Sequence, residues 1–181
     1  MKASIILSTY NRPQALLTVL EALNLQTIQD FEVCIADDGS TKDTQQIIEN
    51  FQQKSAFPIL HAWQDDRGFR AASARNNAVR MSSGDYLLFL DGDCIPRPNW
   101  IHQHLTLSEK HAFVAGNRVL LDETLSHAIE THRIPFTDLF GLNVLRHKDH
   151  INRLMPLLKI PLGSMRRLKP TSWAKVRTCN L

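Results

Sequence analysis

The chain has 181 residues, a net charge of +3 and 43% hydrophobic residues, values that fit one globular α/β domain folding without disulfides or a structural metal. No stretch reaches the roughly 18 uninterrupted apolar residues that cross a bilayer, which argues against an integral membrane protein. The three cysteines form no CxxC pair and predict reduced thiols, and the N-terminus carries no signal-peptide core. We therefore expect a cytoplasmic location.

The first half of the chain alternates β-branched apolar runs with segments of helical periodicity, the pattern of a parallel sheet wound with helices. Pro13 stands at the favoured first position of a helix, and leucines recur behind it at helical spacing. The pattern predicts strands over 3–8, 31–37 and 59–63, and helices over 13–25, 41–53 and 69–81.

A fourth strand, central in the sheet, is predicted over residues 86–90. Two prolines then interrupt the backbone, a helix is predicted over 99–110 and a further strand over 113–121. Residues 122–181 contain helix-like patches without clear periodic order. We expect one α/β domain with a mostly parallel, Rossmann-like central sheet flanked by helices.

The strongest chemical signal is the run LLFLDGD, in which a buried strand ends on Asp91 and Asp93. Ligands of open α/β sheets bind at the carboxyl ends of the strands. Two carboxylates one residue apart can converge on a hard cation such as Mg²⁺ or Mn²⁺. The alternative is a turn that uses Asp and Gly for backbone reasons alone.

Polar clusters follow the other strands as well, and parallel winding places them all at the same edge of the sheet. They lie at 9–12, 37–40 and 64–67. A Tyr ring and a carboxylate could hold a nucleobase there, although helix capping and turn formation explain each loop equally well. Arg75 lies in an alanine-rich helix start, where a long cationic side chain indicates an anionic partner such as a diphosphate.

Four segments in this order, SIILSTYNR, VCIADDGS, GFRAASARNNAV and LLFLDGDCIP, resemble the family 2 inverting glycosyltransferases of GT-A fold. The sequences of these motifs are most similar to those of bacterial chondroitin-polymerase-like and galactosyltransferase-like domains. The resemblance implies that Asp93 is the principal ligand of Mn²⁺ or Mg²⁺ and that Asp91 contacts metal or donor sugar. Arg75 would support the nucleotide. The other residues that we expect to line the uridine and donor site are Thr9, Tyr10, Arg12, Asp37 and Asp38.

The resemblance also implies a function: transfer of a hexose or N-acetylhexosamine from a UDP-sugar to a glycan or lipid-linked saccharide, with inversion. Residues 1–120 would form the nucleotide-sugar-binding core and residues 121–181 the start of an acceptor-side region. We expect the general base to lie beyond Leu181 in a chain shortened at its C-terminus, which leaves the catalytic residue unknown.

Two other functions are compatible with the residues: a donor-binding fragment without turnover, and, more distantly, a Mg²⁺-dependent aspartyl phosphatase with Asp91 as nucleophile. Residues 146–181 hold 9 Lys and Arg against a single acidic residue, Asp149. This basic tail could contact lipid headgroups at the inner face of the plasma membrane, although ordinary surface charge is the favoured interpretation. No nucleic-acid partner is expected.

Overall fold

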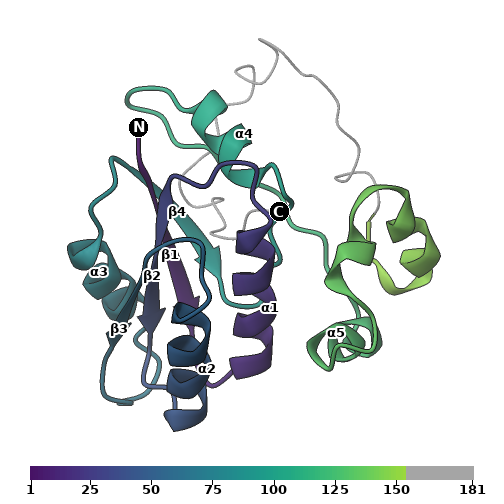
Figure 1. Ribbon diagram of the computed structural model, residues 1–181, viewed down its shortest axis with the longest axis horizontal. Coiled ribbons are helices and arrows are strands. Elements are labelled where there is room, and N and C mark those ends of the chain that lie inside the picture. Colours follow the sequence, from purple (N-terminus) through teal and green to yellow (C-terminus); the bar gives the residue numbers. More distant parts are fainter. Residues whose placement is uncertain (154–181) are drawn as a thin grey trace.

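The computed structural model describes residues 1–153, which form a sheet of four parallel strands in the order β3-β2-β1-β4 with helices on both faces (Figure 1). Parallel order follows from the helices that connect successive strands across the sheet. The predicted parallel α/β architecture is confirmed, but the fourth strand, predicted to be central, is an edge strand of this described sheet and pairs with β1. The strands are β1 (Ala3–Thr9), β2 (Phe31–Asp37), β3 (Ile59–Trp63) and β4 (Tyr86–Asp91).

The two central strands are buried on both faces, which is why they appear in the sequence as continuous apolar runs. Alternate residues of β1 enter different cores. Ile5 and Leu7 pack with α1 (Pro13–Asn24) and α2 (Lys42–Gln52), whereas Ile6 packs with the alanines of α3 (Ala71–Met81). The carboxyl ends of β1, β2 and β4 are level, since Thr9 pairs with Asp37 and Ser8 with Asp91.

The helices agree with the predicted ranges to within three residues. The helix α4 (Trp100–Leu107) adds Trp100 and Ile101 to the core shared with α1 and α2. Beyond it, α5 (Glu123–Glu130) and the 3-10 segments η1 (Phe136–Leu139) and η2 (Gly141–His150) pack around a smaller apolar cluster. In Figure 1 these elements lie beside the sheet domain, next to α1.

The strand predicted over 113–121 is wrong. Within the described part of the chain this segment pairs only at Leu121, which forms an isolated antiparallel bridge with Ile151. Its apolar side chains Val119 and Leu121 pack instead on the cluster beneath α5. An apolar, β-branched sequence gives a strand only where a neighbouring backbone is available for pairing.

Across residues 1–153, no helix is long and apolar enough to cross a membrane. Cys34 and Cys94 are buried thiols that form no disulfide, whereas Cys179 lies outside the described residues. Most of the basic tail also lies outside them, so the predicted lipid contact stays a prediction.

The buried Glu32 carboxylate connects β1, β2 and the turn before β4 at the amino edge of the sheet. It accepts hydrogen bonds from the Ser4 hydroxyl at 2.6 Å and from the Ser83 hydroxyl at 2.9 Å, and it pairs with Lys2 Nζ at 3.0 Å. Burial alone would raise the pKa of Glu32, but the hydrogen bonds from Ser4, the Ser83 backbone and Lys2 outweigh it and lower the pKa to about 2.

We expect acid to destabilise the fold through Glu32. Because the folded-state pKa is depressed, its stabilisation is complete well above the unfolded value near 4.5 and is lost as the pH falls toward 2. Between pH 6 and pH 3 the loss should be about 2 kcal/mol of unfolding free energy. Urea titrations at both pH values measure it. In Glu32→Gln the drop should shrink by that amount, and an unchanged drop would contradict the assignment.

Candidate functional site

A cleft of about 400 Å³ opens at the carboxyl edge of the sheet, where the loops after β1, β2, β3 and β4 meet. Most of the residues proposed from the sequence for the donor site line this cleft, but Asp37 and the polar cluster at 64–67 do not. Those that line the cleft are Thr9, Tyr10, Arg12, Asp38, Arg75, Asp91 and Asp93.

The turn that follows β4 carries the acidic pair. Gly92 donates its backbone N–H to the Ser8 carbonyl at 2.7 Å, and a Cβ on Gly92 would stand only 2.7 Å from that same oxygen. Glycine is therefore needed for the turn to pack against β1. Ligand atoms of Asp91, Asp93 and Cys94 all lie within 4.8 Å of one another, a spacing that could hold one metal ion. Carboxylate oxygens suit a hard divalent cation.

The two aspartates have different surroundings. Asp91 Oδ1 accepts hydrogen bonds from Arg75 Nη2 at 2.8 Å and from the Ser8 hydroxyl at 3.0 Å, and Arg75 Nη2 also donates to Ser8 Oγ at 3.0 Å. The Asp93 side chain is 53% exposed, and Arg12 Nη1 lies 3.8 Å from its Oδ2. Much of the charge of Asp91 is thus balanced inside the protein, whereas Asp93 faces the cleft.

The position of Arg75 explains the alanines around it. Ala74 and Ala78 are fully buried against the sheet, so α3 lies close to β1 and β2. At that short distance the Arg75 side chain reaches the ends of β1 and β4 and meets Asp91 there.

Tyr10 and Asp38 define the other end of the cleft. The Tyr10 hydroxyl donates to Asp66 Oδ2 at 2.9 Å, and this hydrogen bond to a carboxylate raises the pKa of Tyr10. Asp38 accepts from the Gln64 side-chain amide at 2.6 Å and from the Arg70 backbone N–H at 2.7 Å. The loop between β3 and α3 therefore fixes both side chains.

Thr9 contributes a buried hydroxyl that has no hydrogen-bond partner among the described residues. The residue is 7% exposed, and among the described residues its Oγ1 finds no partner. It lines the cleft beside Gly92, whose added Cβ would lie 3.5 Å from this oxygen. Buried polar groups are normally paired, so a ligand or a cation-bound water in the cleft would complete this site. The acidic cluster and the Thr9 hydroxyl together fit a divalent cation with its anionic ligand.

Asp37 is placed elsewhere. Its buried carboxylate is bonded to His61 Nε2 at 2.9 Å and to the Ser40 N–H at 2.8 Å. Burial alone would raise the pKa of Asp37, but the hydrogen bonds from His61 and Ser40 lower it. The structure does not bring Asp37 into the cleft, where the sequence had placed it. This carboxylate instead holds the turn after β2 in shape.

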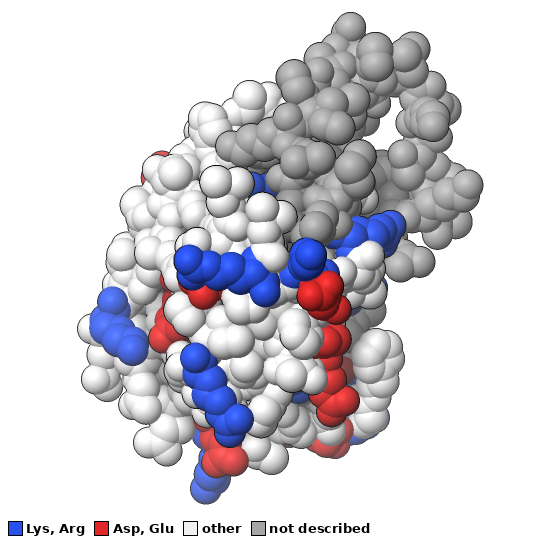
Figure 2. All heavy atoms as spheres, turned by 90° about the vertical axis from the view of Figure 1, so that its right-hand side faces the viewer, with Lys and Arg blue, Asp and Glu red and all other residues white. Residues whose placement is uncertain are grey.

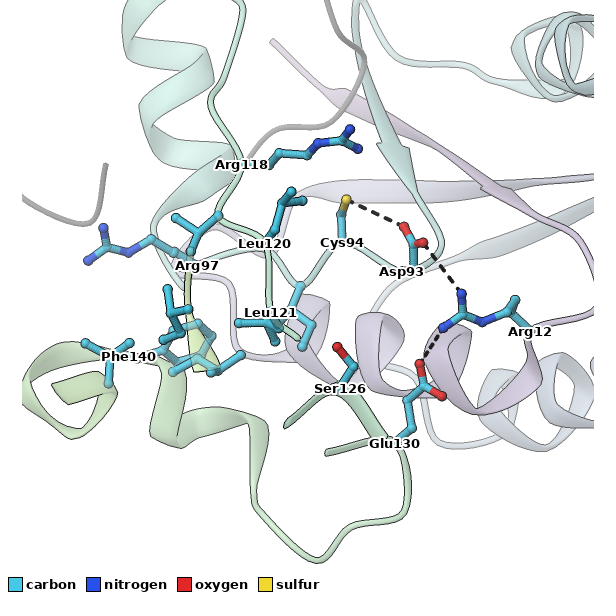
Figure 3. A pocket seen from close by; sticks show the side chains of 15 residues that line it. Arg12, Asp93, Cys94, Arg97, Arg118, Leu120, Leu121, Ser126, Glu130 and Phe140 are labelled. Carbon is cyan, nitrogen blue, oxygen red and sulfur yellow. Dashed lines mark hydrogen bonds and ion pairs between the residues drawn. The ribbon is translucent and has the colours of Figure 1, made fainter. Parts of the chain in front are cut away.

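A second hollow, of about 270 Å³, adjoins the cleft on the side of α5 and shares with it Arg12, Asp93 and Arg118 (Figure 3). Its floor is mostly aliphatic, and Glu130 lies at its rim, 2.6 Å from Arg12 Nη2. Figure 2 shows this side of the molecule, where acidic side chains form a narrow column and basic side chains lie in small separate groups.

Several lining residues escaped the sequence reasoning. Ser8 could have been predicted from strand pairing, because it lies directly opposite Asp91 on the neighbouring parallel strand. Phe69 is 95% exposed and lines the cleft directly after the β3 loop. Arg118 and Glu130 have no local motif and reach the site only through the tertiary fold.

A parallel sheet with an Asp-Gly-Asp turn at its carboxyl edge is the arrangement found in nucleotide-sugar transferase domains of GT-A fold. The chain belongs to glycosyl transferase family 2, whose family model matches residues 4–169. This confirms the family and the fold class expected from the sequence.

Among curated relatives, the hyaluronan synthase of Pasteurella multocida is 37% identical over 122 residues, covering 66% of this chain and 12% of the relative. The chondroitin synthase of Escherichia coli is 36% identical over 105 residues, covering 58% and 15%. TarS of S. aureus, solved in complex with UDP-GlcNAc, is 29% identical with a TM-score of 0.50, covering 59% and 30%. The chain thus spans well under half of each of these proteins.

Proposed function

We propose that the chain carries the donor site of a metal-dependent glycosyltransferase, which transfers a hexose or N-acetylhexosamine from a UDP-sugar with inversion. The observation that carries the proposal is the meeting of Asp93, the Asp91–Arg75 pair, Tyr10 and Asp38 in one cleft. The TarS structures with UDP and UDP-GlcNAc support a uridine nucleotide as the donor.

In this proposal Asp93, with Asp91 beside it, would hold Mn²⁺ or Mg²⁺. The ion, when bound, supplies positive charge that stabilises the leaving diphosphate. Arg75 keeps Asp91 oriented and adds a second positive charge at the same edge of the cleft. The Arg75 guanidinium would thereby help to stabilise the charge that develops on the diphosphate as the bond to the sugar breaks.

The nucleoside would occupy the Tyr10 end. Tyr10 is 48% exposed and offers a ring face for the base, and the Asp38 carboxylate is held where it could accept the imide N–H of uracil. Thr9 would donate or accept the hydrogen bond that it lacks. Asp37 supports this site only indirectly, through the turn that carries Asp38 and Ser40.

For the acceptor we propose a glycan or a lipid-linked saccharide, in line with the names of the polysaccharide synthases among the relatives. A cytoplasmic reaction at the inner membrane face stays a prediction, as does the division at residue 120. We assign no general base among residues 1–153. The phosphatase alternative is disfavoured by the family match and by Arg75, which engages the carboxylate that would have to attack.

Titration calorimetry tests the donor site directly. UDP should bind the chain with Mn²⁺ and bind much more weakly in EDTA, whereas GDP should bind poorly in both conditions. Transfer is followed separately, as UDP release and as labelled product from UDP-GlcNAc, UDP-glucose and UDP-galactose with an oligosaccharide acceptor. Binding without product would favour the donor-binding alternative. Equal UDP affinity in Mn²⁺ and EDTA would reject the metal role.

A further inference from the structure

Arg12 stands between two carboxylates. Its Nη2 lies 2.6 Å from Glu130 Oε1, and its Nη1 lies 3.8 Å from Asp93 Oδ2. Figure 3 shows the guanidinium between these groups, where the donor cleft meets the adjoining hollow. The shorter contact is with Glu130, so in this arrangement Arg12 is drawn away from Asp93.

The backbone that carries Arg12 is held in place. Asn11 has a left-handed conformation, with φ 49°, and donates its N–H to Ser40 Oγ at 2.9 Å. Its side-chain oxygen accepts from the Thr41 N–H at 2.9 Å, and α1 begins directly afterwards at Pro13. With the backbone fixed on both sides, only the Arg12 side chain can change partner.

Glu130 is delivered by a well-formed helix. Asp122 caps α5 by accepting the Leu125 N–H at 2.8 Å, and Leu125 and Ile129 are buried beneath the helix. Glu130 is the last residue of α5, where the helix dipole disfavours a negative charge. The contact with Arg12 offsets that disadvantage and connects α5 to the donor cleft.

We infer that Glu130 is a positioning residue that holds the Arg12 guanidinium off Asp93 and so keeps this carboxylate open to a divalent cation. The inference rests on the proposed function, because it takes Asp93 as a metal ligand. A guanidinium and a metal ion compete for the same negative charge. Without the Glu130 carboxylate, the Arg12 guanidinium would pair with its other acidic neighbour, Asp93. A divalent cation would then have to displace the guanidinium before it could bind Asp93.

Binding of Mn²⁺ alone, measured by electron paramagnetic resonance on the whole chain, separates these effects. Glu130→Gln should weaken Mn²⁺ binding about twofold to fivefold, the scale expected for partly exposed charges. In an Arg12→Gln background the same change should have little effect, because no guanidinium remains to be held. Glu123→Gln, an exposed residue in the first turn of the same helix, is the matched control and should leave affinity unchanged.

A second readout needs no metal. The Nε–H resonance of Arg12, identified by its absence in Arg12→Gln, should move in Glu130→Gln and stay in place in Glu123→Gln. Glu130→Asp, which keeps the charge on a shorter side chain, should fall between the original chain and Glu130→Gln in both measurements.

Three results would overturn the inference. In the first, Glu130→Gln binds Mn²⁺ with the affinity of the original chain. In the second, Glu130→Gln weakens Mn²⁺ binding equally with and without Arg12, which would show that the charge of Glu130 attracts the ion directly. If the unaltered chain binds no Mn²⁺, the metal role of Asp93 fails and the inference fails with it. Mn²⁺ binding that is insensitive to Glu130 rejects only the positioning role.

Discussion

Asp93→Asn is expected to reduce Mn²⁺-dependent UDP binding and sugar transfer by at least ~100-fold, because a neutral amide replaces the carboxylate most exposed to the cleft. Asparagine keeps nearly the same size and one oxygen, so the turn at Gly92 should persist. The measurement is the UDP affinity at several Mn²⁺ concentrations. In the variant the dependence on Mn²⁺ should flatten along with the loss of affinity.

Asp85→Asn provides the control for this experiment. Asp85 precedes the same strand, β4, but lies exposed at the opposite edge of the sheet, where it accepts a weak hydrogen bond from the Lys2 N–H at 3.4 Å. Its replacement should leave UDP binding and its Mn²⁺ dependence unchanged. A large and equal loss in both variants would mean that β4, and not the metal site, is affected.

Much of the fold could be predicted because a parallel sheet buries both faces of its strands. The runs at β1 and β2 have no polar face, and the alanines of α3 mark the close approach of a helix. The strand predicted over 113–121 failed because composition indicates that a segment suits a sheet but does not supply a partner. Within residues 1–153 its side chains contribute more by packing on Ile129 and its neighbours.

The site followed from one topological rule, which places strand-end loops at one edge of the sheet. That rule cannot separate adjacent residues such as Asp37 and Asp38. Only the tertiary neighbours do so, since His61 holds the first carboxylate inside the fold and Arg70 orients the second at the cleft. Glu130 was out of reach for a similar reason: 118 residues separate it from Arg12, and no local pattern indicates their contact.

Arg75→Met should lower transfer from a UDP-sugar by about 100-fold while changing the binding of Mn²⁺ alone much less. Arg75 gives Asp91 its charged hydrogen bond at 2.8 Å, and both side chains are about one-quarter exposed. Methionine preserves much of the volume near the alanines but removes the charge. The loss should therefore appear where negative charge develops on the diphosphate, which is the situation in which one fixed donor contributes ~10²–10³-fold.

Two further variants show whether that loss depends on charge and position. Arg80→Met changes an exposed cation on the same helix, whose Nη1 donates to Asn77 Oδ1 at 2.9 Å, and this variant should transfer sugar at the original rate. Arg75→Lys keeps the charge on a side chain that cannot reproduce the contacts of a guanidinium with Ser8 and Asp91, so it should recover part of the activity. Steady-state kinetics with saturating Mn²⁺ give kcat and KM for each chain. If Arg75→Met and Arg80→Met behave alike, Arg75 serves only the packing of α3, and the charge that stabilises the leaving diphosphate has to come from elsewhere in the cleft.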